Sequence, residues 1–280
     1  LLLASEQARR RLNRALADER VRRARFDGEL DAARDIQHGI LPKAGDFDLP
    51  AACSLSAELR SAAEVGGDLY DIAWLDERRL FFVLGDVSGK GVPASLFMAV
   101  SKTLCKSSAL RGVASADAVL TRANREIARE NPSLLFVTAV AAIVDVQSGE
   151  LSLASAGHEA PLLINPSRTP RRVQDPGGPP LCALEDFEYP EHRVRMSPGD
   201  TLILITDGVT EAANSQGEFF GVDRVVEALS DVSETEDANA LTDRLIGAVD
   251  AFTHGAAPSD DIAILAFQYQ ALGSRSLDGG

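Results

Sequence analysis

Apolar runs that end or begin at an aspartate recur along the chain, and no other feature constrains the fold as strongly. Each aspartate stands beside small or turn-forming residues, in the segments Gly66-Gly67-Asp68, Gly85-Asp86-Val87, Thr206-Asp207-Gly208 and Ser259-Asp260-Asp261. Carboxylates gathered at strand ends are costly unless a positive charge compensates them, because they repel one another and lose hydration. Oxygen-only ligands suit hard divalent cations such as magnesium or manganese. The pattern therefore predicts a metal-dependent enzyme.

Length and composition narrow the class of protein. The chain has 280 residues, a hydrophobic content of 45% and a charged content of 25%, which suit one large globular domain with an appendage. Its formal net charge of -14 argues against a nucleic-acid-binding surface, which needs clustered Lys and Arg. The cysteines Cys53, Cys105 and Cys182 lie far apart in the sequence and indicate neither a zinc site nor a disulfide framework. A reducing, cytoplasmic setting fits this usage best.

The N-terminal stretch is expected to be a long helix. Residues 5–40 contain no proline and are rich in helix-forming residues, and an interrupted apolar seam runs from Leu12 to Ile40. Such a seam suits a helical linker that pairs with a second copy or docks on its own domain, and it equally suits a solvated amphipathic helix. Because the chain begins with Leu1, we expect a missing upstream sensor; no apolar run here is long enough to span a membrane.

The remaining chain alternates strands and helices. Strand pairs joined by tight turns imply antiparallel sheets, with helix pairs covering their outer faces in an α+β fold. The segment 166–180, with its prolines and glycines, is expected to be a surface loop. We expect a helical linker over residues 1–41, a catalytic domain over 42–270 and a disordered tail over 271–280. Strands are expected at residues 68–75, 79–87, 135–146, 150–155, 193–196, 201–206 and 261–268, and helices at 93–111, 116–130, 222–230 and 238–252.

Two of these segments also resemble motifs of other protein classes. The segment from Gly85 to Gly91 superficially resembles a Walker A phosphate loop, but its glycine spacing is one residue too short and Gly91 replaces the required Ser or Thr. Gly66-Gly67-Asp68 resembles the nucleotide cyclases that make cyclic dinucleotides, but Leu69-Tyr70 replaces their acidic-aromatic pair. Neither interpretation explains the whole set of aspartates.

The order of the motifs along the chain and their residues together point to one family. The motifs are Ala33-Arg34-Asp35-Ile36-Gln37 with Leu41-Pro42, then Val65-Gly66-Gly67-Asp68-Leu69-Tyr70-Asp71, the segment 85–91, Ser155-Ala156-Gly157-His158, Thr206-Asp207-Gly208 and Asp260-Asp261. Together they resemble the PPM family, the metal-dependent serine/threonine phosphatases also called protein phosphatase 2C. The likeness is to the bacterial branch named after stage II sporulation protein E, and it covers about residues 30 to 270.

The resemblance implies a fold and a ligand set. The fold would be an α-β-β-α sandwich of two antiparallel sheets, with two divalent cations, manganese or magnesium, in the cleft between the sheet ends. Asp68 and Asp86 would hold these cations, with Asp86 bridging them and Val87 contributing its main-chain carbonyl. Asp207 and Asp260 would complete the set. Of the Asp260-Asp261 pair, the first matches the family's ligand position.

The chain departs from the eukaryotic branch of the family at several positions. Ser88 stands where that branch has a histidine proposed as general acid, and a counterpart of its phosphate-clamping arginine is not evident. Lys90 could assist a phosphate electrostatically, although a solvated turn lysine is the simpler interpretation. His158 fits a structural hydrogen-bonding role better than a catalytic one.

The predicted activity is hydrolysis of phosphoserine or phosphothreonine on a regulatory protein. The family likeness suggests a phosphorylated anti-sigma-factor antagonist, acting in a partner-switching pathway, as the substrate. Alternatives are a catalytically degenerate module used for binding or dimerisation, and a hydrolase of small phosphorylated metabolites. The helix over residues 5–40 would link the absent sensor to the catalytic domain and pair with a second copy.

Overall fold

The computed structural model describes residues 2–50, 53–112, 115–129, 131–165, 168–173, 176–233 and 235–270. The chain divides into two units, Leu1–Ile40 and Leu41–Gly280. The tail predicted to be disordered, residues 271–280, lies outside the described residues.

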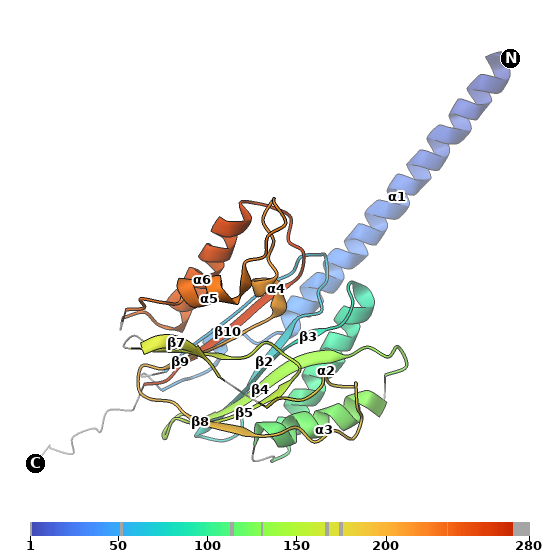
Figure 1. Ribbon diagram of the computed structural model, residues 1–280. Helices are drawn as coiled ribbons and strands as arrows, with labels where there is room; N and C mark the ends of the chain where they lie inside the picture. The colour runs from blue at the N-terminus through green and yellow to red at the C-terminus, as the bar shows by residue number, and fades with distance from the viewer. Residues whose placement is uncertain are drawn as a thin grey trace, which may run out of the picture. The chain divides into compact units, whose positions relative to one another are not determined.

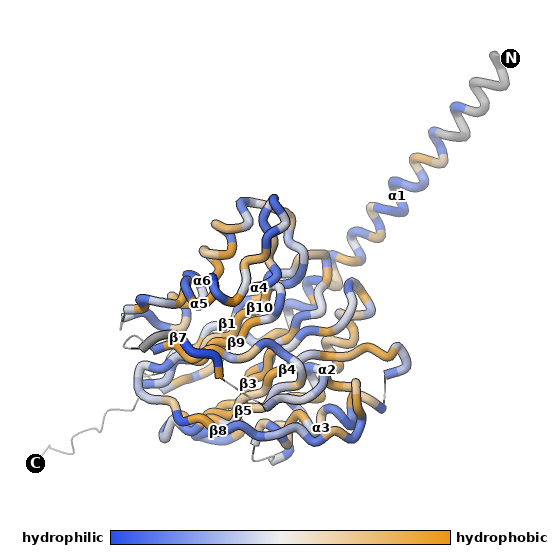
Figure 2. The backbone as a smooth tube through the Cα atoms, in the orientation of Figure 1, coloured by the Kyte–Doolittle hydropathy of each residue, from blue (hydrophilic) through white to orange (hydrophobic). Residues whose placement is uncertain are grey.

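The N-terminal unit is a single helix, α1 (Leu2–Ile40), which confirms the helix predicted over residues 5–40. Its apolar side chains Leu16, Phe26 and Ile36 are exposed. Ion pairs such as Arg25–Glu29 form between successive turns of the helix on its solvent-exposed surface. Figure 2 shows how sparsely apolar residues are spread along this helix. Among the described helices, none combines the length and the hydropathy that a membrane span requires.

The second unit contains two antiparallel sheets, each of five strands within the described ranges, which lie face to face in Figure 1. Sheet I consists, in spatial order, of β1 (Ser54–Arg60), β10 (Ile262–Gln268), β9 (Thr201–Ile205), β6 (Leu162–Asn165) and β7 (Arg168–Arg172). Sheet II consists of β2 (Leu69–Trp74), β3 (Arg79–Val87), β4 (Val137–Asp145), β5 (Glu150–Ala156) and β8 (His192–Arg195).

Strand β3 shows why these segments read as continuous apolar runs. Alternate side chains of a strand point to opposite faces, and both faces of β3 are buried. Phe82 packs between the sheets, with its ring centroid 5.9 Å from that of Phe267 on β10. Its neighbour Phe81 packs on the other face, in the core beneath the helices. Figure 2 shows the resulting concentration of apolar residues in the strands.

Helices cover the outer face of each sheet, so the predicted α-β-β-α sandwich is confirmed (Figure 1). Helices α2 (Val92–Leu110) and α3 (Ala116–Arg129) share a core with sheet II. Helices α5 (Gly221–Ala228) and α6 (Ala238–Thr253) share a core with sheet I. The short elements are η1 (Ala44–Asp46) and α4 (Asp207–Thr210).

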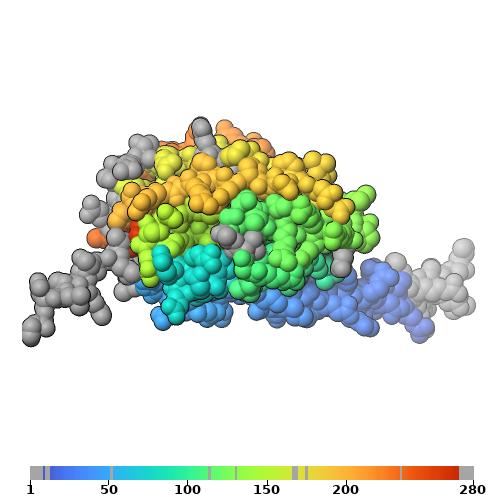
Figure 3. Space-filling model, turned by 90° about the horizontal axis from the view of Figure 1, so that it is seen from below, coloured from blue at the N-terminus to red at the C-terminus, as the bar shows by residue number. Residues whose placement is uncertain are grey.

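The segment 176–191, between β7 and β8, lies along α3, as Figure 3 shows. The buried side chain of Asn124 on α3 holds it. Its amide nitrogen donates to the carbonyls of Leu184 and Glu185 at 2.8 and 3.0 Å, and its oxygen accepts from the Cys182 amide at 2.7 Å. One polar side chain thereby satisfies three backbone groups of an irregular segment.

The sequence prediction missed β1, β6 and β7. The segment 166–180, expected to be entirely loop, contains β7, which pairs with β6. Pro170 lies within β7 and lacks an N–H donor, but β7 is at the edge of sheet I, where a proline is tolerated. Strand β1 is also an edge strand, and its alternating polar residues gave a weaker signal than the buried runs.

A buried ion-pair cluster fixes α2 to sheet II. Asp71 on β2 has no exposed surface, and its carboxylate accepts from Lys102 Nζ at 2.6 Å and from Lys106 Nζ at 2.9 Å. Lys102 is also buried, whereas the Lys106 side chain is 36% exposed. Breaking the Asp71–Lys102 pair should therefore destabilise the fold more than breaking the Asp71–Lys106 pair, because a buried charge without its partner is strongly unfavourable.

We expect Asp71→Asn to lower the free energy of unfolding by about 3–5 kcal/mol, because it leaves the Lys102 ammonium buried without a counter-charge. Lys106→Met should cost at most about 1 kcal/mol, since that ammonium reaches solvent. Urea denaturation followed by circular dichroism measures both. Equal losses in the two variants would contradict the different burial of the two lysines.

Candidate metal centre

Strand pairing places the predicted aspartates side by side in two pairs. In sheet II, Leu69 pairs with Gly85, so Asp68 lies next to Asp86 at the end of β2 and β3. In sheet I, Ile205 pairs with Ile264, so the chain leaving β9 at Asp207 lies beside the chain entering β10 after Asp260. Each pair therefore follows from an antiparallel register.

Thr206 joins the two pairs across the sandwich. Its hydroxyl donates to Asp68 Oδ2 at 2.8 Å and accepts from the Ala263 amide at 2.9 Å. Thr206 has no exposed surface, and Asp68 is only 2% exposed. A buried hydrogen bond thus connects the end of sheet I to the end of sheet II.

Electrostatics shows that the carboxylates interact with one another. Burial, then the charge of Asp86, raises the pKa of Asp68 well above its usual value. Burial, followed by the charges of Asp207 and Asp260, raises the pKa of Asp86 to about 7. Burial and the Asp260 charge also raise the pKa of Asp207. The cluster is therefore a concentrated negative site that favours cations.

Glycines let the backbone approach this cluster closely. A Cβ on Gly67 would lie 2.9 Å from the Val87 carbonyl oxygen and 3.0 Å from Asp86 Oδ1. The Val87 carbonyl and the Asp86 carboxylate therefore face the same narrow space beside the Gly66-Gly67 turn. This arrangement agrees with the prediction that the Asp86 carboxylate and the Val87 carbonyl are ligands of the same site.

Asp261 has a structural role that the sequence did not reveal. Its carboxylate accepts hydrogen bonds from the Ala62 amide at 2.8 Å and from the Gly67 amide at 2.7 Å, and it is buried. A Cβ on Gly66 would lie 2.0 Å from Asp261 Oδ2, so only glycine fits there. Asp261 thus holds the loop that precedes Asp68. These hydrogen bonds favour Asp260 over Asp261 as a candidate ligand.

Lys90 lies across the rim of the cluster. Its Nζ donates to the Ser259 carbonyl at 2.7 Å and lies 3.0 Å from Asp260 Oδ2. The pKa of Lys90 is raised, first by the hydrogen bond to Asp260. The Lys90 side chain is 66% exposed and the Asp260 side chain 42%, so solvent screens the pair and it contributes little to stability. The ion pair instead holds the turn after β3 next to the loop that leads into β10.

Ser88 and His158 form hydrogen bonds that fit structural roles. The Ser88 hydroxyl accepts from the Phe136 amide at 3.0 Å. His158 Nδ1 lies 3.0 Å from the hydroxyl of Thr138, the residue that pairs with Asp86 in the sheet. Burial lowers the pKa of His158 to about 4, so the ring is neutral near pH 7. A neutral, buried imidazole is a weak general acid.

The donor set suits a hard divalent cation. Asp68, Asp86, Asp207, Asp260 and the Val87 carbonyl offer oxygen atoms alone, as magnesium and manganese prefer. In the described part of the chain, no three His, Cys, Asp or Glu side chains are already arranged to hold an ion. The carboxylates are close enough to raise one another's pKa. The residues fit such a cation, and their role as ligands stays a prediction.

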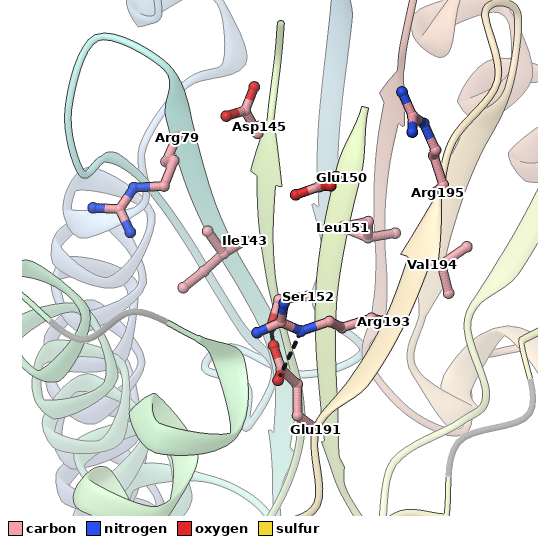
Figure 4. A pocket seen from close by; sticks show the side chains of 10 residues that line it. All are labelled: Arg79, Ile143, Asp145, Glu150, Leu151, Ser152, Glu191, Arg193, Val194 and Arg195. Atoms are coloured by element: carbon pink, nitrogen blue, oxygen red, sulfur yellow. Dashed lines mark hydrogen bonds and ion pairs between the residues drawn. The ribbon is translucent and has the colours of Figure 1, made fainter. Parts of the chain in front are cut away.

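A separate hollow of about 350 Å³ lies at the other end of sheet II (Figure 4). It is lined by residues of β3, β4, β5 and β8. Arg79 lies in it at the start of β3, about 23 Å from Asp86 at the usual rise per residue of a strand. Within it, Arg193 Nε and Ser152 Oγ donate to the Glu191 carboxylate at 3.0 and 2.7 Å. This hollow takes no part in the aspartate cluster.

Comparison with known proteins decides the family. The sequence model of stage II sporulation protein E (SpoIIE) matches residues 76–270, well over half of the chain. The chain belongs to the SpoIIE family. The matched range contains Asp86, Asp207 and Asp260, whereas Asp68 lies just before it.

Curated relatives support the same assignment. Protein IcfG of Synechocystis sp. is 30% identical over 268 residues, which cover 85% of this chain and 41% of IcfG. The phosphoserine phosphatase RsbU of Bacillus subtilis is 26% identical over 189 residues, covering 68% of this chain and 55% of RsbU. The phosphoserine phosphatase RsbP of the same organism is 25% identical over 67% of this chain and 46% of RsbP. The chain spans about half the length of these relatives.

Solved structures share the fold. The SiaA-PP2C domain of Pseudomonas aeruginosa has a TM-score of 0.76 at 22% identity, covering 89% of this chain and 98% of that one. The PP2C phosphatase domain of SpoIIE from Bacillus subtilis, with a fragment of its regulatory domain, has a TM-score of 0.67 at 18% identity, covering 78% of this chain and 64% of that one. The sandwich described above is therefore the PP2C-type fold.

The neighbouring aspartates Asp260 and Asp261 should respond differently to substitution. Asp261→Ala removes the acceptor of two backbone amides and should lower the free energy of unfolding by about 2–4 kcal/mol. Asp260→Ala should change it by less than about 1 kcal/mol, because that side chain is 42% exposed and its ion pair with Lys90 lies at the surface. Urea denaturation in chelator-containing buffer makes the comparison. A larger loss in Asp260→Ala would overturn the division of roles.

Proposed function

We propose that this chain is a metal-dependent protein phosphatase that hydrolyses phosphoserine or phosphothreonine. The observation that carries the proposal is geometric: strand register places Asp68 beside Asp86 and Asp207 beside the Asp260 segment, and the hydrogen bond from Thr206 to Asp68 joins the two sheets at this end. Membership of the SpoIIE family and likeness to two named phosphoserine phosphatases support it.

The proposed roles of the residues follow from their positions. Asp68, Asp86, Asp207 and Asp260 would hold two divalent cations, manganese or magnesium, with Asp86 shared between them and Val87 adding its carbonyl. When bound, these cations supply Lewis-acid activation of a water nucleophile and neutralise charge on the phosphoryl oxygens. Lys90, at the rim, would keep the Asp260 loop in place through its ion pair with Asp260 and its hydrogen bond to the Ser259 carbonyl.

The cysteines give no sign of a covalent phosphoenzyme route. Burial raises the pKa of Cys105 to about 12 and that of Cys182 to about 11, and it also raises the pKa of Cys53. A protonated thiol is a poor nucleophile. Direct attack by water is the route that these residues favour.

The proposed substrate is a phosphorylated regulatory protein of the anti-sigma-factor antagonist type. The support is the resemblance to the partner-switching branch together with the RsbU and RsbP relatives. The alternative, a catalytically degenerate binding module of the same fold, requires loss of the acidic ligands. The chain retains all four aspartates, and their mutual repulsion would serve no purpose in a pure binding module.

We expect manganese or magnesium to restore hydrolysis of a phosphoserine peptide by protein pretreated with EDTA. Asp86→Ala and Asp207→Ala should each reduce kcat/KM by about a thousandfold or more, since ligand loss removes several kcal/mol of transition-state stabilisation. The matched control is Asp186→Ala, which removes a carboxylate that is 89% exposed and lies 3.9 Å from Arg125 Nε on α3. Full activity in both ligand variants, or activity indifferent to chelation, would refute the assignment.

The same proposal includes pairing of two copies through α1, whose apolar side chains Leu16, Phe26 and Ile36 are exposed. We expect a chain that starts at Leu41 to be monomeric and less active than the full chain. Analytical ultracentrifugation and the phosphopeptide assay measure this. The same oligomeric state and equal activity in the two forms would contradict a regulatory role for α1.

A further inference from the structure

A second hollow, of about 410 Å³, opens directly beside the aspartate cluster. Its walls come from the end of β1, the region of α4, the C-terminal turn of α6 and the loop that leads into β10. Gly208 and Asp260 line it, so it shares a rim with the candidate metal centre. Its volume lies within the range of small-molecule and side-chain pockets.

Local backbone geometry creates this space. Helix α6 ends at Thr253, and the two residues that follow it, His254 and Gly255, have left-handed φ angles of 48° and 78° that turn the chain away from the helix axis. The walls on either side carry the small side chains Ala213 and Ala256. Larger side chains at these two positions would occupy the space.

The charges around the hollow are already engaged. Arg60 on β1 reaches Asp250 on α6, with Nη1 3.2 and 3.0 Å from the two carboxylate oxygens. At the other rim, Lys90 is paired with Asp260. A carboxylate entering the hollow would meet Asp250 and Asp260 with no free cation among the residues that line it. An uncharged aliphatic group would instead lie against alanine, valine and proline surfaces.

We propose that this hollow is a substrate subsite that receives an aliphatic side chain of the phosphoprotein, close in sequence to the phosphoserine. The inference rests on the proposed phosphatase function and adds a determinant of specificity to it. The basis of the inference is that the hollow adjoins the candidate metal centre, because Gly208 and Asp260 line one of its walls. An extended chain advances about 3.5 Å per residue, so the positions to test are those within about two residues of the phosphoserine.

The test uses two kinds of probe. p-Nitrophenyl phosphate reports hydrolysis that does not involve the hollow. Phosphoserine peptides with leucine or aspartate at each of the two positions on either side of the phosphoserine report the subsite. The variants are Ala213→Leu and Ala256→Leu, which fill the hollow from opposite walls. Ala251→Leu, at an exposed position of α6 outside the hollow, is the matched control.

We expect the natural chain to prefer the leucine peptide over the aspartate peptide by about tenfold in kcat/KM at one flanking position. Both filling variants should abolish that preference through a higher KM, with p-nitrophenyl phosphate turnover unchanged, and Ala251→Leu should behave as the natural chain does.

Three results would overturn the subsite. They are no leucine preference in the natural chain, a preference that survives both filling variants, and an equal loss of turnover on both kinds of probe. A natural chain that hydrolyses neither probe with manganese present fails the proposed function itself, which is a distinguishable outcome.

Discussion

At the shared end of the two sheets, the buried carboxylate of Asp68 lies beside Asp86 and accepts a hydrogen bond from Thr206 of the other sheet. Carboxylates this close repel one another, and burial weakens the screening that water would provide. The fold must therefore hold them in place by other interactions. The hydrogen bonds of Thr206 and the amides that Asp261 engages supply part of that restraint.

Close backbone approach is the second requirement of the site. A Cβ on Gly208 would lie 1.7 Å from the Asp261 carbonyl oxygen, and one on Gly66 would overlap the Asp261 carboxylate. These glycines let three loops from both sheets converge without a side chain between them. The loop that carries Asp68 is thus positioned by the residue that follows Asp260, so the candidate ligands from the two sheets are mechanically linked.

The sandwich provides a rigid base for these loops. Strand β3 carries Asp86 near its end and is buried on both faces. Side-chain packing on either face prevents it from shifting register. Asp71 and Lys102 fix α2, which begins just after the turn containing Lys90, to β2, which begins just after Asp68. Loops carry the chemistry while buried strands and their helices hold the loops in place.

Much of this protein was readable in its sequence, since apolar runs and helix-forming stretches are local signals. They predicted the principal strands and helices, antiparallel sheets covered by helices and the aspartates at strand ends, and the family resemblance implied the two-sheet sandwich. The edge strand β7 escaped prediction because Pro170 and its polar neighbours resemble a loop, and only its pairing with β6 makes it a strand. The role of Asp261 escaped for a similar reason, because its partner Gly67 lies 194 positions away. Which residues supply acidic groups is thus a property of the sequence. Which of them bind backbone amides, and where a hollow opens beside the others, depends on long-range packing that no local pattern encodes.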